Sequence, residues 1–407
     1  MKFSNVEFVV YSSYDTPIFK THDMINGEIF FTPLQETNIE DVSITFKGKR
    51  VTRSSTTVGI LTRRTGMTRV EVENMNTHLP LPSSRLEKTF LSMDLPVYDY
   101  FCDTSTLEPG KSYRMPFKFI VPDKLPIHTC HHQCANHQIQ QEHLQLPASL
   151  SYHTKKSHEI HDMSPEMTEV LYSINLALWQ RDGKAGRPKK IQESTHPVQI
   201  LPTRNEHAPI LVPGKNNYYQ LRAEKSLSTG MLRHACGKLA AYSAQPPAIQ
   251  LQSLQQTNSN ASTSLKINLR FDPSHLGQLP PSLLATDFQL RAMTFFGLEP
   301  CHDYPDLTDV STWGTRREFW SDCVALTANN EIKMDWNSET EGERTIFTAS
   351  IETSVSLPTR RCYPPTFHSC LVSRVYSLKA RLFYRVHGKA RSRSSISVTV
   401  PVEICVI

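Results

Sequence analysis

The chain has 407 residues, of which 39% are hydrophobic and 20% are charged, a composition typical of a globular protein and not of a disordered one. At about 100–200 residues per domain, this length predicts two domains. The net charge of +5 is a mild bias that does not call for a nucleic-acid partner and is compatible with an acidic membrane surface. The irregularly spaced cysteines and the lack of a membrane-spanning apolar run or a signal peptide predict a reduced, cytosolic protein.

Hydrophobic alternation with a period of two predicts strands along the first half of the chain. In residues 39–51, for example, Val42, Ile44 and Phe46 share one face, and polar side chains occupy the other, as in a half-buried strand. The predicted strands of this half are residues 3–11, 25–31, 39–51, 113–121 and 170–179.

The second half has the same pattern, and no stretch of the chain shows a capped helical periodicity. Its predicted strands are residues 265–271, 288–296, 345–355, 372–384 and 395–407. Strands joined by long polar loops favour antiparallel sandwiches over βαβ units. The predicted fold is therefore all-β, with two antiparallel immunoglobulin-like β-sandwich domains in tandem.

The predicted domain boundary is a polar stretch bracketed by Pro202 and Pro209. It divides the chain into an N-terminal domain, residues 1–205, and a C-terminal domain, residues 212–407. A second polar stretch, residues 245–264, is rich in Gln, Asn, Ser and Thr, and we expect it to be a mobile loop within the second domain.

Several short motifs, taken in order, resemble the arrestin-like proteins, and the fungal members in particular. Residues 23–31 (Asp-Met-Ile-Asn-Gly-Glu-Ile-Phe-Phe) and 39–48 resemble the first strands of the arrestin-like N-terminal domain. Further similar segments are residues 107–119, with a Met-Pro-Phe-Lys-Phe strand, residues 146–150 (Leu-Pro-Ala-Ser-Leu), residues 170–178, and, in the C-terminal domain, residues 376–382 and 400–404.

This resemblance implies the tandem arrestin fold and a non-enzymatic adaptor without a cofactor. Such an adaptor would bind the cytosolic tails of membrane transporters or receptors and link them to ubiquitylation and endocytic trafficking. It would be cytoplasmic and recruited peripherally to the plasma membrane or endosomes. A retromer-type sorting scaffold of the same fold is the alternative within this class.

The densest group of potential metal ligands lies in residues 128–143. Cys130, Cys134, His137 and His143 are candidate ligands of a tetrahedral zinc ion. Because the spacing is loose and no second Cys pair accompanies it, we interpret the segment as a polar loop and expect no bound metal. A metal-dependent enzyme using this loop is an alternative from another class.

A ubiquitin-ligase WW domain binds a Pro-Pro-x-Tyr peptide as polyproline II, and this motif is absent from the chain. The nearest variant is Leu95, Pro96, Val97 and Tyr98, which we predict to be the ligase-binding motif. A weaker variant at residues 363–367 has Phe367 in the place of the tyrosine.

A basic segment at residues 183–190 supplies Lys184, Arg187, Lys189 and Lys190. We predict a solvated hairpin tip, and these four residues are candidates for the alternative, a contact with phosphates or acidic lipid headgroups. Its Gly-Arg-Pro core leaves a DNA-binding factor as a further alternative. The sequence contains none of the common catalytic motifs, such as Gly-x-Ser-x-Gly or the phosphate-binding Gly-rich loop.

Overall fold

The computed structural model describes most of the chain in fourteen segments. These are residues 6–12, 17–54, 84–96, 106–151, 162–181, 188–207, 219–229, 234–251, 261–305, 317–328, 334–341, 344–359, 361–387 and 393–407. Almost all of the secondary structure is β, and the prediction of an all-β sandwich fold is confirmed.

The N-terminal half of the chain forms two facing sheets. Its elements are β1 (Glu7–Val10), β2 (Ile18–Phe19), β3 (Met24–Phe31), β4 (Thr37–Asn38), β5 (Asp41–Ser54), β6 (Ser84–Leu95), β7 (Thr106–Leu107), β8 (Tyr113–Ile120), the 3-10 helix η2 (Ile127–Thr129), α1 (His137–His143), β9 (Thr168–Arg181) and β10 (Pro188–Ile200). One sheet has the order β1-β3-β8, and the other has the order β2-β10-β9-β5-β6. Phe46 of β5 and Phe119 of β8 meet between them, with ring centroids 5.9 Å apart.

The C-terminal half forms a second, larger set of strands. They are β11 (Arg222–Thr229), β12 (His234–Tyr242), β13 (Ile249–Leu251), β14 (Ser262–Pro273), β15 (Ser282–Gly297), β16 (Arg317–Ala328), β17 (Asn337–Glu341), β18 (Arg344–Ser356), β19 (Phe367–His368), β20 (Val372–Arg385), β21 (Ser394–Val402) and β22 (Ile404–Val406). The main path runs β11-β12-β14-β18-β16-β15-β20-β19, with β17 beside β18 and β21 beside β20. Only two residue pairs join β16 to β18, at the place where the path passes between the two layers of the sandwich.

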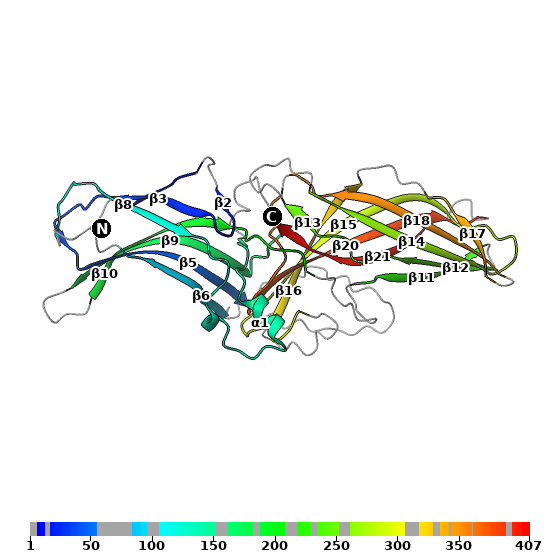
Figure 1. The fold of residues 1–407 in the computed structure, drawn as a ribbon, viewed down its shortest axis with the longest axis horizontal. Coiled ribbons are helices and arrows are strands. Elements are labelled where there is room, and N and C mark those ends of the chain that lie inside the picture. Colours follow the sequence, from blue (N-terminus) through cyan, green and yellow to red (C-terminus); the bar gives the residue numbers. More distant parts are fainter. Residues whose placement is uncertain are drawn as a thin grey trace, which may run out of the picture.

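Among the described residues, the strands of each half pair only with strands of the same half. The two halves lie along the long axis of the molecule, with α1 and the C-terminus near its middle (Figure 1). The predicted boundary falls between β10 and β11, and residues 208–218 of it lie outside the described residues.

Each predicted strand overlaps an observed strand, but the sequence pattern missed others. Among the elements that were not predicted are the strands β6, β10, β11 and β16 and the helix α1. The loop expected at residues 245–264 is shorter than predicted, because Ile249–Leu251 forms β13 and residue 262 begins β14. Residues 252–260 of that loop lie outside the described residues.

Gly27 of β3 is required by the close approach of its neighbours in the first sheet. A Cβ at this position would lie 2.1 Å from the main-chain oxygen of Val9 and 2.7 Å from the ring of Phe117. Because Val9 is paired to β3 along its backbone, it cannot yield without breaking the sheet.

We therefore expect Gly27→Ala to lower the free energy of unfolding by about 1–3 kcal/mol through overpacking. Urea unfolding followed by tryptophan fluorescence measures the change. Ser350→Ala, at an exposed position of β18, is the control and should stay within about 0.5 kcal/mol of wild type. Equal stability of the two variants would contradict the close packing at Gly27.

Candidate functional site at the junction of the two halves

Several backbone segments meet where the two halves join. The segment of residues 201–207 leaves β10 and runs beside the C-terminal strand, with the Arg204 amide donating to the carbonyl of Val406 at 3.0 Å. The last strand, β22, pairs in parallel with β13. The helix α1 projects from the N-terminal half at this level (Figure 1). Its N-cap is Asn136, whose side chain accepts from the Ile139 amide at 3.0 Å.

Four charged side chains from these segments form a buried network. Glu142 comes from α1, Arg204 and His207 come from residues 201–207, and Glu403 lies between β21 and β22. Arg204 Nη1 lies 3.4 Å from Glu142 Oε2, and His207 Nε2 lies 2.8 Å from Glu142 Oε1. The second ring nitrogen of His207, Nδ1, is 3.1 Å from Glu403 Oε1. The network thus connects an N-terminal helix to the end of the C-terminal half.

His207 is held in its charged form by the two carboxylates. Hydrogen bonds to Glu142 and Glu403 raise the pKa of His207 to about 10. The same contact lowers the pKa of Glu142 against the opposing effect of burial. An imidazolium has two N–H donors, and each of them faces one carboxylate here. With Arg204, the network has two positive and two negative charges.

Arg374 of β20 makes a second polar connection between the halves. It is fully buried, and its guanidinium donates to the carbonyls of Asp162 at 2.6 Å and Met163 at 2.9 Å in the N-terminal half. It also donates to Thr294 Oγ1 at 2.5 Å and, through Nε, to Tyr376 Oη at 3.2 Å within its own half. A planar guanidinium has five such donors, so one side chain connects several strands and a loop.

A cluster of cysteine and histidine side chains lies beside this network. Cys130 follows η2, His132 lies in the next turn, and His143 ends α1. Cys370, from the turn between β19 and β20, joins them. The four ligand atoms all lie within 4.8 Å of one another, and three of the four residues are buried.

The structure therefore changes the set of metal candidates that the sequence predicted. It brings Cys130, Cys134 and His143 together, with Cys134 Sγ 3.7 Å from Cys130 Sγ and 3.5 Å from His143 Nδ1. His137 does not join them: it is exposed and contacts Gln141 one turn along α1. The sequence analysis missed His132 and Cys370 as ligands.

Burial favours the neutral forms of Cys130 and His143 in this cluster. It raises the pKa of Cys130 to about 12 and lowers the pKa of His143 to about 4. A neutral imidazole is the form in which histidine binds a metal ion.

The predicted ligase motif is only partly described. Leu95 is the last residue of β6, pairs with Ile44 of β5 and is half-buried, whereas Pro96 is exposed. Val97 and Tyr98 lie outside the described residues. A WW domain would have to detach Leu95 from the sheet in order to bind it in a polyproline II conformation.

The basic segment is described at its C-terminal end. Lys189 and Lys190 are exposed at the start of β10, and Lys190 Nζ is 2.9 Å from Glu193 Oε2 and 5.2 Å from the ring centre of Trp179. Lys184 and Arg187 lie outside the described residues. Because Lys190 is already paired with Glu193 and Trp179, Lys189 is the better placed of the two lysines to contact a phosphate.

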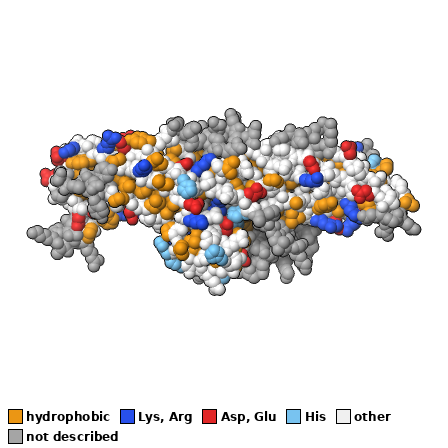
Figure 2. Space-filling view, viewed as in Figure 1, with side chains coloured by type: hydrophobic (Ala, Val, Ile, Leu, Met, Phe, Trp, Pro, Cys, Tyr) orange, Lys and Arg blue, Asp and Glu red, His pale blue; other side chains and the backbone are white. Residues whose placement is uncertain are grey.

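The surface and the pockets offer two further features. Histidine side chains gather on the protrusion below the middle of the molecule in Figure 2, where Figure 1 places α1.

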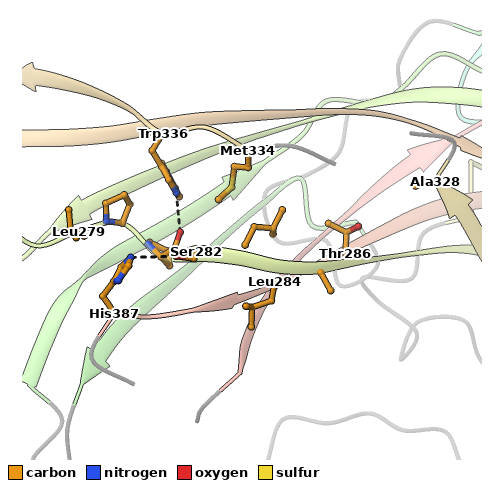
Figure 3. Close-up of a pocket in the computed structure, with 12 residues that line it drawn as sticks. Leu279, Ser282, Leu284, Thr286, Ala328, Met334, Trp336 and His387 are labelled. Carbon is orange, nitrogen blue, oxygen red and sulfur yellow. Dashed lines mark hydrogen bonds between the residues drawn. The ribbon is translucent and has the colours of Figure 1, made fainter. Parts of the chain in front are cut away.

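A pocket of about 660 Å³ opens beside the start of β15, with Leu284, Met334 and Trp336 among its lining residues (Figure 3). Trp336 Nε1 donates to the carbonyl of Pro281 at 3.0 Å there. None of the described residues that line this pocket is acidic or a cysteine.

No helix in the described part of the chain is both long and apolar enough to cross a membrane. A comparison with known protein families finds no match to this sequence, and a comparison with curated proteins finds none either.

The charge of His207 makes the stability of the junction depend on pH. The pKa of His207 is about 10 in the folded chain and 6.5 without the carboxylates. Its contribution to the free energy of unfolding is therefore fully present below pH 6.5 and is lost as the pH rises through about 10. We expect His207→Gln to lower the free energy of unfolding by about 1.5–3 kcal/mol at about pH 6, the range of a hydrogen bond to a charged group, and by much less above about pH 10. Urea unfolding of both proteins across this pH range measures the difference.

His275→Gln is the matched control, because His275 is exposed on a loop of the C-terminal half. It should follow the wild-type stability at every pH. A stability difference for His207→Gln that does not change with pH would contradict an imidazolium at the junction.

Proposed function

We propose that the chain is a non-enzymatic, arrestin-like adaptor that binds extended cytosolic tails of membrane transporters or receptors. It would act in the cytoplasm and be recruited to the plasma membrane or endosomes, where it would link its cargo to ubiquitylation and endocytic trafficking. The order of the arrestin-like motifs and the all-β sandwich fold support this proposal.

The observation that carries the proposal is the open edge of a long strand. In the described part of the chain, β6 pairs with β5 and has no strand on its other side. An extended peptide can add to such an edge through main-chain hydrogen bonds, whereas side-chain pockets would supply specificity. The exposed charges along β6 balance, with Arg85 and Lys88 against Glu87 and Asp94, and Arg85 Nη2 is paired to Glu87 Oε2 at 3.1 Å, so main-chain pairing and not charge would bind the tail.

The buried connections of the junction support the same function. Arg374 and the network of Glu142, Arg204, His207 and Glu403 hold the two halves together. Because the two halves are held together, the strand edges keep a constant arrangement. Less conformational entropy is then lost when a peptide binds to them.

Strand addition to β6 predicts which peptide groups carry binding. Synthetic peptides with the sequences of cytosolic transporter tails should bind the full chain. In a strand, only every second peptide amide faces the neighbouring strand. N-methylation of the amides that face β6 should therefore abolish binding, whereas N-methylation of the amides in between should leave binding unchanged. Fluorescence polarisation measures binding, and hydrogen exchange should show new protection in residues 84–95. Protection elsewhere, or no bound tail, would contradict this mode and favour a retromer-type scaffold that binds coat subunits.

Ligase recruitment predicts a weak WW interaction. Because leucine replaces the first proline and Leu95 is paired in β6, we expect a dissociation constant in the micromolar range or weaker, about −8 kcal/mol at best. Tyr98→Ala should remove this binding, since the tyrosine is the aromatic anchor of the motif. Titration of a WW domain with both proteins provides the measurement. Equal binding by the two would show that the motif is not used, and no binding by either would favour another route to the ubiquitylation machinery.

A further inference from the structure

We propose that Cys130, His132, His143 and Cys370 bind one zinc ion that joins the two halves of the molecule. Three ligands come from the segment between β8 and β9, and the fourth comes from the turn between β19 and β20. The site would therefore be a structural clamp. The proposal goes beyond the adaptor function and does not depend on it.

Two distances within the cluster match those of a zinc tetrahedron. With Zn–S near 2.3 Å and Zn–N near 2.0–2.1 Å, tetrahedral angles require about 3.8 Å between two sulfur ligands and about 3.6 Å between sulfur and nitrogen. Cys130 Sγ lies 3.7 Å from His132 Nδ1 and 3.8 Å from His143 Nδ1. The other donor pairs, including those with Cys370, are at most 4.8 Å apart.

A hydrogen bond fixes the tautomer that His132 needs as a ligand. Its Nε2 lies 3.0 Å from the carbonyl oxygen of Cys301 in the C-terminal half. A carbonyl can only accept, so Nε2 carries the proton and Nδ1 presents its lone pair toward Cys130. Metal-bound histidines commonly donate their other ring nitrogen in this way. The neighbouring Ala135 amide donates to the carbonyl of His302 at 2.8 Å and holds the loop in place.

A buried cation lies beside the cluster. Arg50 of β5 is 2% exposed, its Nη1 contacts Ser369 Oγ at 3.4 Å, and its Nε has no hydrogen-bond partner among the described residues. Ser369 directly precedes Cys370, so the guanidinium lies next to the site. Zinc binding would convert the thiols of Cys130 and Cys370 to thiolates, whose two negative charges balance the 2+ charge of the ion, so the loaded site would add no net charge beside Arg50.

The donor set selects the metal. Two sulfurs and two imidazole nitrogens in a tetrahedron suit zinc, whereas calcium and magnesium require oxygen ligands. Cys134 is the competitor of Cys370 for the fourth position, because its Sγ lies 3.7 Å from Cys130 Sγ and 3.5 Å from His143 Nδ1.

Metal content of purified protein tests the clamp. We expect the full chain, expressed without a histidine tag in zinc-supplemented medium and kept reduced, to contain about one zinc per chain by mass spectrometry. Cys130→Ser, His143→Asn and Cys370→Ser should each lower the content at least tenfold. His137→Asn and Cys323→Ser are the controls, because His137 is exposed on the same segment and Cys323 lies in β16, and both should keep the zinc.

Cys370→Ser is the deciding variant, because it separates a clamp from a site within one loop. Zinc retained by Cys370→Ser would overturn the proposal, as would a wild-type chain that takes up no zinc in competition with a chromophoric chelator. Circular dichroism checks that each variant folds. If Cys370→Ser does not fold, Cys134→Ser decides between the two sites: retained zinc supports the clamp, and lost zinc overturns it. Cobalt substitution of the wild type gives a further check, because an octahedral spectrum without thiolate charge transfer would overturn any site with cysteine ligands.

Discussion

A charge can be buried at the junction only if an opposite charge or a full set of hydrogen-bond partners is buried with it. Glu142, Arg204 and Glu403 are each less than a tenth exposed, so none of them can rely on water. His207 lies between the two carboxylates and carries a proton on each ring nitrogen, so that its positive charge neutralises part of their negative charge. Removal of Glu142 or Arg204, the most deeply buried members, would leave an uncompensated charge in the interior, which commonly costs about 3–5 kcal/mol. The relative position of α1, the segment after β10 and the C-terminal strand follows from this requirement.

The buried charges at the junction restrict the relative orientation of the two halves more than apolar contacts alone would. Apolar surfaces pack in many arrangements of similar energy, whereas hydrogen-bonded charges require one geometry. Arg374 reinforces this choice, because its guanidinium reaches the carbonyls of Asp162 and Met163 across the junction. The binding surfaces are consequently expected at strand edges such as β6 and not within the junction itself.

The sequence predicts those strands whose two faces differ. β14 and β5 alternate between apolar and polar residues because one face of each covers a core, and both were predicted. β10 was missed because its sequence, Pro-Lys-Lys-Ile-Gln-Glu-Ser-Thr-His-Pro-Val-Gln-Ile, is polar over most of its length and largely exposed or half-buried. The seven-residue α1 has too few turns for an apolar stripe, and only Asn136 as an N-cap marks its start. The residues of the site were harder to predict than the strands. Cys370 and Glu403 reach the site through tertiary contacts, which no local sequence pattern indicates.

The helix α1 explains how the charged network and the cysteine cluster come to lie side by side. Glu142 and His143 are consecutive, so their side chains diverge by about 100° around the helix axis. Glu142 faces His207 and Arg204, and His143 faces Cys130 and Cys134. One short turn of helix thus holds two groups that reach the C-terminal half, one through Glu403 and the other through Cys370. A helix of this length is marginal in isolation, so its stability must come from tertiary contacts, which include the buried Ile139 as well as these two groups. Together with Arg374, α1 is thus one of the elements through which the two halves are coupled.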